Sequence, residues 1–323
     1  MSPVALTPSA PAAASPAQLA QEWAKRYVRN LNDPNQALID DPATVAKKLQ
    51  ADLRQASVQA WNRTEGFLGS ELRRHDIAAE LIDPWDISKD IHDIYQQTLT
   101  LYRDGKTPDQ LTMTVGPTVG QVRRKHTAVD PRVIGFVSLQ FHHTGVILLQ
   151  NAPASQRETL QNFFKVIDDH LYMPLHRAYE AAANHDYNSP GLSLVRHLLP
   201  ESTAIATTIC QRVAAAFQNH RCFTGPLNHP QVRTSSIRDV EMFQIYLWVC
   251  LLEGSLDAIQ RELFPLCLML YPTLNVTWEL VYQMVYLLGT EIKTRTTNLD
   301  SAALTPYYQA LREMFNPKIF QGV

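Results

Sequence analysis

The stretch from Asp239 to Pro272, DVEMFQIYLWVCLLEGSLDAIQRELFPLCLMLYP, constrains the fold more than any other part of the chain. Its first half runs from Phe243 to Leu252 with Gln244 as the polar exception, so little of a helix built from it can face water. Glu253-Gly254-Ser255 then interrupts the run, and Pro272 ends a second apolar helical pattern. The sequence therefore predicts a central helical hairpin, on which the chain downstream of about residue 130 packs.

This hairpin resembles a single tetratricopeptide-type unit in the order of its residues. A tyrosine, an apolar run, Glu-Gly, an alanine and a final Leu-Tyr-Pro follow one another, although the step from Gly254 to Ala258 is one residue short of that repeat. Helical periodicity recurs in most of the remaining chain. We therefore expect an all-α fold of stacked helical hairpins, tetratricopeptide-like at 239–272, with at most a two-stranded β patch near 111–139.

Composition divides the chain into four parts. Residues 1–16 are rich in Pro, Ala and Ser and predict a disordered tail. Residues 17–110 predict an N-terminal helical section. Residues 111–130 begin with LTMTVGPTVGQV, whose β-branched residues, glycines and proline favour a linker or a short strand. Residues 131–320 predict the main helical domain.

Charge and cysteine content narrow the class of protein. With 29 basic and 31 acidic residues the net charge is -2, which offers no broad field to nucleic acid. None of the four cysteines forms a C-x-x-C pair, as is typical of a reduced cytoplasmic protein.

The longest apolar run, Ile245 to Leu252, is too short for a transmembrane segment. Peripheral membrane association stays open. The cluster Arg123-Arg124-Lys125-His126 predicts a solvated helix end or loop.

Polar residues that could support chemistry gather on the helix expected at 156–183, and they are Asp168, Asp169, His170 and His176. Asp169 and His176 lie seven residues apart, close to two helical turns, so both side chains should emerge from one face. Pro174 should kink this helix and free a backbone carbonyl that needs another donor. The candidate metal ligands are therefore Asp169, His170 and His176, and the alternative is that this face is a solvated or interhelical polar seam around the proline kink.

His142 and His143 complete the set of catalytic candidates with Asp169 and His176. They are adjacent in an otherwise apolar run, so a regular helix or strand cannot aim both rings at one metal ion. A histidine in such a run is more often a hydrogen-bonded core residue than a base. No E-x-x-H spacing, glycine-rich phosphate loop or dinucleotide fingerprint is present, so we assign no cofactor-binding residues and expect no cofactor.

Four runs carry a resemblance to a known family: FVSLQFHHTG, DDHLYMPLHRAYEAAA, SSIRDVEMFQIYL and ELFPLCLMLYP. They resemble a cyanobacterial all-α protein family with no assigned activity, over about residues 130–320. The resemblance implies a cytoplasmic protein of a photosynthetic bacterium, and it implies no catalytic residue.

Two functions follow from these patterns. Stacked helical hairpins and the lack of catalytic motifs favour an interaction, assembly or regulatory scaffold with a protein partner, linked through the resemblance to photosynthetic machinery. The alternative is a metal-assisted enzyme that uses the Asp/His face of helix 156–183. The first is the principal prediction, which makes an enzyme the less favoured outcome.

Overall fold

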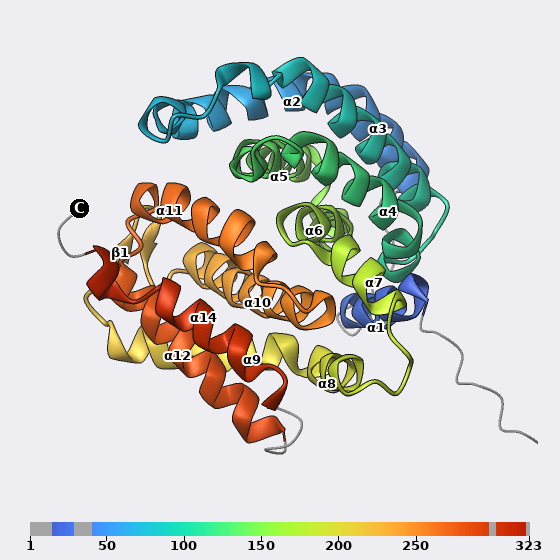
Figure 1. Cartoon of the computed structure of the whole chain (residues 1–323). Coiled ribbons are helices and arrows are strands. Elements are labelled where there is room, and N and C mark those ends of the chain that lie inside the picture. Colours follow the sequence, from blue (N-terminus) through green and yellow to red (C-terminus); the bar gives the residue numbers. More distant parts are fainter. Residues whose placement is uncertain (1–14, 29–40, 297–301, 321–323) are drawn as a thin grey trace, which may run out of the picture.

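The computed structural model describes residues 15–28, 41–296 and 302–320, and nearly all of their regular structure is helical (Figure 1). This confirms the all-α prediction. The α-helices are α1 (Pro16–Val28), α2 (Pro42–Arg74), α3 (Pro84–Arg103), α4 (Pro108–Thr127), α5 (Ile134–Asn151), α6 (Arg157–Tyr172), α7 (Leu175–Ala183), α8 (Pro190–Leu198), α9 (Ser202–Ala216), α10 (Pro230–Glu253), α11 (Phe264–Thr273), α12 (Trp278–Arg295) and α14 (Thr305–Met314). Short turns of other helix types are η1 (Ala79–Leu81), η2 (Pro131–Val133), η3 (Ala154–Gln156), η4 (Leu199–Glu201), the π-helical η5 (Ala258–Leu263) and η6 (Pro317–Phe320). The predicted tail, residues 1–16, lies outside the described residues except for Ser15 and Pro16, and Pro16 begins α1.

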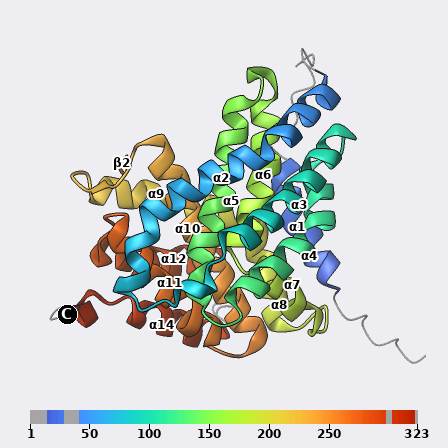
Figure 2. The same ribbon diagram turned by 90° about the horizontal axis from the view of Figure 1, so that it is seen from above.

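The helices form successive layers (Figure 1). Helices α2 and α3 lie along one side, α4 and α5 lie beneath them, and α6 and α7 occupy the middle. Helix α10 contacts α7, α9, α12 and α14, and it lies between the α6–α7 layer and the layer of α9, α12 and α14 (Figure 1). The helix expected at the centre of the fold is therefore central. The view from above in Figure 2 shows α2 crossing over α5.

The predicted hairpin exists, with altered ends. Helix α10 begins at Pro230 instead of near Asp239 and ends at Glu253, where Gly254 caps it with a left-handed φ of 67° that glycine adopts readily. Pro272 lies inside α11, which continues to Thr273. The repeat-like stacking of several hairpins is not confirmed.

The structure contains a two-stranded sheet, but not at the predicted position near residues 111–139. Strands β1 (Arg221–Cys222) and β2 (Gly225–Pro226) pair antiparallel. The linker or strand expected at 111–130 is wrong, because residues up to Thr127 belong to α4. The glycines of α4 serve close packing: a Cβ on Gly120 would stand 2.5 Å from the Cβ of His176 on α7.

Pro174 breaks the helix expected at 156–183 into α6 and α7, where the sequence predicted a kink. Arg123 of α4 supplies donors at the break: its Nη1 lies 2.5 Å from the carbonyl oxygen of Leu171 and 3.0 Å from that of Tyr172. Arg123 is therefore buried at the helix junction, and the prediction that it belongs to a solvated cluster is wrong. Its sequence neighbour Arg124 is exposed, as expected.

Helix α5 is long and strongly apolar. The segment Pro131–Asn151 could span a membrane by length and composition, yet 67% of it is buried inside the protein. A buried core helix passes the same test, and α5 packs between α2 and α6 (Figure 1). We therefore describe it as a core helix.

Candidate functional site

A cavity of about 550 Å³ opens where α2, α5, α6, the β1–β2 hairpin, α10 and the end of α11 meet. Its volume falls in the range of small-molecule sites, and its wall combines apolar and ionisable side chains as such sites do. Both predicted histidines of α5, His142 and His143, line it. The centres of the two rings are 5.8 Å apart, and both rings line the same cavity although the residues are neighbours in sequence.

His142 pairs with Asp168 of α6. Its Nδ1 lies 2.7 Å from Oδ2 of Asp168, and the carboxylate side chain is 17% exposed against 40% for the imidazole. A carboxylate at Nδ1 favours the tautomer with the proton on that nitrogen, which leaves the Nε2 lone pair for another proton. Among the described residues Nε2 has no hydrogen-bond partner. The pair therefore has the arrangement of an oriented general base.

His143 has a different environment. It is half-buried, and burial together with the neighbouring His142 and Arg63 lowers its pKa to about 4. The ring is therefore neutral near pH 7, and it can donate one hydrogen bond and accept another without carrying charge.

Helix α10 contributes Arg238 and Asp239 to the cavity wall. The hydroxyl of Tyr172 donates to Oδ1 of Asp239 at 3.1 Å, and the guanidinium carbon of Arg238 lies 4.5 Å from the centre of the Tyr172 ring. Burial raises the pKa of Asp239 to about 6, although Arg238 and the Tyr172 hydroxyl oppose the shift. Burial and the carboxylate of Asp239 also raise the pKa of Tyr172 well above its ordinary value.

A second cavity of about 510 Å³ lies next to the first. Four residues line both of them, and they are His142, Asp168, Ser235 and Arg238. The His142–Asp168 pair and the Arg238 side chain thus stand at the boundary between the two cavities. A ligand in either cavity can reach both groups.

The residues predicted on the Asp/His face are separated by the break at Pro174. Asp169 is fully buried on α6 and accepts from Lys165 at 2.8 Å, whereas His176, on α7, pairs with Glu180 at 3.2 Å. Burial, the largest influence, lowers the pKa of His176. Asp169 and His176 therefore belong to different helices and to different ion pairs.

His170 is a structural residue by its contacts. Its Nδ1 lies 2.8 Å from the carbonyl oxygen of Val166, and its Nε2 lies 3.2 Å from the hydroxyl of Tyr179. The ring is fully buried and also borders Gly116 of α4. Both nitrogens are engaged within the protein, which is the arrangement of a hydrogen-bonded core histidine.

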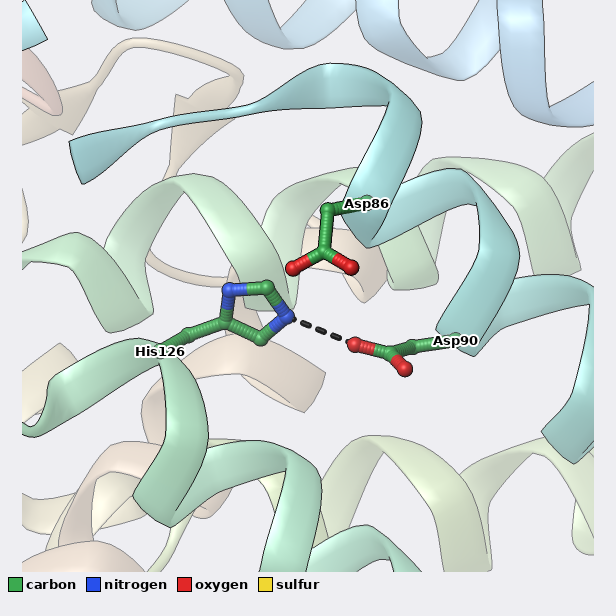
Figure 3. Close-up of side chains that lie close together, drawn as sticks. All are labelled: Asp86, Asp90 and His126. Carbon is green, nitrogen blue, oxygen red and sulfur yellow. Dashed lines mark hydrogen bonds and ion pairs between the residues drawn. The ribbon is translucent and has the colours of Figure 1, made fainter. Parts of the chain in front are cut away.

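One cluster within the described ranges has ligand atoms close enough for a metal ion, and it lies outside the predicted face. Asp86 and Asp90 of α3 and His126 of α4 form it, as Figure 3 shows. The ammonium of Lys125 lies 2.7 Å from Oδ2 of Asp86 and 2.9 Å from Oδ2 of Asp90, so a cation of the chain already occupies this position. Burial opposes the charge of Asp90, but hydrogen bonds from His126 and Lys125 outweigh it and keep the pKa of Asp90 below its ordinary value. We interpret the cluster as an ion-pair network that joins α3 to α4.

The sequence indicates His142 and His143 but does not reveal their partners. The sequence places Asp168 on the polar face of its helix without pairing it with His142, and it places Arg238 and Asp239 at the start of the central helix. The one signal for them is the pair of charges Arg238-Asp239 next to an almost wholly apolar segment. Charges at such a boundary often line a cavity or an interface.

No family model matches the chain, and neither does any curated protein or solved structure. The resemblance to a cyanobacterial family therefore rests on the four quoted runs alone. What the protein does has to be inferred from the geometry of the cavity.

Proposed function

We propose that the protein is an enzyme that binds a small organic substrate in the 550 Å³ cavity and removes a proton from it or from a bound water. The observation that carries the proposal is the 2.7 Å pairing of His142 Nδ1 with Asp168 at the cavity wall. A carboxylate that orients an imidazole and stabilises its charged form is a recurrent arrangement for general-base catalysis.

Burial and charge around the pair support this role. Asp168 is mostly buried, while the His142 ring is exposed enough to be reached from the cavity. When Nε2 takes a proton, the charge that develops on the ring lies against the Asp168 carboxylate, which stabilises it. The positive guanidinium of Arg238 lines the same cavity and can stabilise negative charge that develops on the substrate.

The scaffold function predicted from the sequence, with its protein partner and its link to photosynthetic machinery, stays a prediction. So does the cytoplasmic location. The cavity favours a small ligand because helices and a hairpin from six parts of the chain converge on it. A pull-down with the full chain as bait tests the scaffold function independently.

The catalytic proposal can be tested by an unbiased search for the substrate. Purified protein is incubated with a small-molecule extract of its host, and the change in metabolite masses is followed by mass spectrometry. We expect wild type to deplete at least one compound and to form its product. His142→Gln should slow this conversion by about 10²- to 10⁴-fold, the usual contribution of a general base.

A matched control separates catalysis from folding. His92 is an exposed histidine of α3 outside the cavity, so His92→Gln should convert the compound as wild type does. Melting temperatures of all three proteins should agree within a few degrees. Wild-type protein that converts nothing, or His142→Gln that converts as fast as wild type, would contradict the proposal.

A further inference from the structure

Arg238 presents a guanidinium whose hydrogen-bonding capacity is not used up by the protein. Its Nε is buried and has no hydrogen-bond partner among the described residues. The guanidinium carbon lies over the face of the Tyr172 ring, which offers no strong acceptor. A guanidinium in this state is costly to bury unless a ligand or solvent accepts from it.

Each carboxylate around Arg238 has at least one oxygen paired with another group, and Oδ1 of Asp168 is buried without a hydrogen-bond partner among the described residues. Asp168 pairs with His142, Asp169 with Lys165, and Asp239 with the Tyr172 hydroxyl. They act on Arg238 at a distance: burial disfavours its charge, and Tyr172 and these carboxylates outweigh that effect and raise its pKa. Arg238 therefore stays charged, with its planar fork of donors able to pair with a ligand.

The same cavity offers an apolar surface for the body of a ligand. Phe67 of α2 and Phe223 of the hairpin meet with ring centres 5.4 Å apart, and Leu270, Leu274 and Val276 line the wall with them. Phe223 is held in part by its backbone N–H, which donates to the carbonyl of Leu274 at 2.8 Å. A wholly polar ligand would leave this surface without a partner.

Charge limits the ligand further. Two arginines, Arg63 and Arg238, and two carboxylates, Asp168 and Asp239, line the cavity. Arg63 is exposed, so solvent screens its charge. A single negative charge on the ligand can pair with Arg238, whereas a dianion would bring a second charge against the two carboxylates. The balance favours a monoanion.

We infer that the cavity binds an organic monocarboxylate with an apolar or aromatic body, whose carboxylate pairs with Arg238. This inference rests on the proposed function in taking the cavity as the substrate site, and it names the substrate class. Because Arg238 and His142 line both cavities, a carboxylate on Arg238 places the ligand within reach of the base. Arg238 is a substrate-anchoring residue in this arrangement.

The test compares ligands that differ in charge and share a body. Binding of naphthalene-2-carboxylate, octanoate, naphthalene-2-carboxamide and 2-naphthyl phosphate to the full chain is measured by isothermal titration calorimetry. We expect at least one carboxylate to bind with a Kd below about 1 mM and tenfold or more tighter than the neutral amide. The dianionic phosphate should bind more weakly than the matched carboxylate.

Variants assign the preference to Arg238. Arg238→Gln should remove the difference between carboxylate and amide, and Arg238→Lys should keep part of it because the charge remains without the fork. Arg54→Gln alters an exposed arginine of α2 that does not line the cavity, and it should bind as wild type does. The wild-type comparison stands even if Arg238→Gln fails to fold.

The outcomes separate this inference from the catalytic proposal. Equal affinity for carboxylate and amide, tighter binding of the phosphate, no carboxylate binding, or an unchanged preference in a folded Arg238→Gln would each overturn the inference. His142→Gln tested in the same assay should still prefer the carboxylate. Binding without any conversion would therefore count against the catalytic role and leave the ligand class intact.

Discussion

Replacing Arg123 should be among the most destabilising single changes at the junction between α6 and α7. Its Nη1 donates to the carbonyls of Leu171 and Tyr172. Its Nη2 donates to the hydroxyl of Tyr246 at 2.8 Å and to Oε2 of Glu262 at 3.2 Å. The side chain is nearly fully buried, so water cannot replace these donors.

The expected cost for Arg123→Met follows from what the change leaves behind. Two buried carbonyls lose their donor, at about 1 to 3 kcal/mol each if nothing replaces it. Removing one partner of a buried ion pair costs about 3 to 5 kcal/mol. The costs of the lost carbonyl bonds and of the lost ion pair are not additive, so the total stays near that range. Glu262 also pairs with Arg177, so its charge stays compensated. We expect a loss of about 3 kcal/mol of unfolding free energy.

The measurement is urea-induced unfolding followed by circular dichroism, with Arg124→Met as the control. Arg124 stands next in sequence and pairs with Glu180 at 2.6 Å, but both side chains are about half exposed. A surface pair of this kind contributes about 0 to 1 kcal/mol. Should Arg123→Met unfold within about 1 kcal/mol of wild type, Arg123 would not hold the helix junction and the reasoning would be refuted.

Two further predictions concern the central helices. Leu247→Ala and Leu263→Ala each truncate a fully buried side chain, so each should lower the free energy of unfolding by about 2 to 5 kcal/mol, and an unchanged urea midpoint would place the hairpin at the periphery. Asp239 has a pKa raised by burial from 3.8 to about 6, so the folded protein binds this proton more tightly than the unfolded chain. The contribution of protonated Asp239 to the unfolding free energy is fully present below about pH 4 and is lost as the pH rises through about 6. The unfolding free energy of Asp239→Asn, relative to that of wild type, should therefore rise by up to about 3 kcal/mol between pH 4 and pH 7. A difference in unfolding free energy that does not depend on pH would contradict this.

The candidate site could be predicted only in part. The apolar run around His142 and His143 marks both residues for attention, and both line the cavity. Their neighbour Asp168 belongs to another helix, and no local pattern encodes the 2.7 Å contact between His142 and Asp168. The same holds for Arg238, because a charge beside an apolar run looks the same in sequence whether its partner is solvent, a carboxylate or a cavity.

Residue type and spacing were enough to locate most helices and to identify the one at the centre. A run with one polar residue from Phe243 to Leu252 leaves no face for water, and Gly254 ends it because glycine adopts the left-handed conformation at low cost. These features depend on residues a few positions apart, so they are encoded locally.

The helical state of α4 and the break at Pro174 depend instead on contacts between helices. The run LTMTVGPTVGQV has the composition of a strand or loop, yet it is helical because Gly116 and Gly120 let α4 approach the histidines of α6 and α7 closely. The chain can break at Pro174 because Arg123, from a helix distant in sequence, donates to carbonyls there. Both outcomes arise because the packing energy between helices exceeds local propensity.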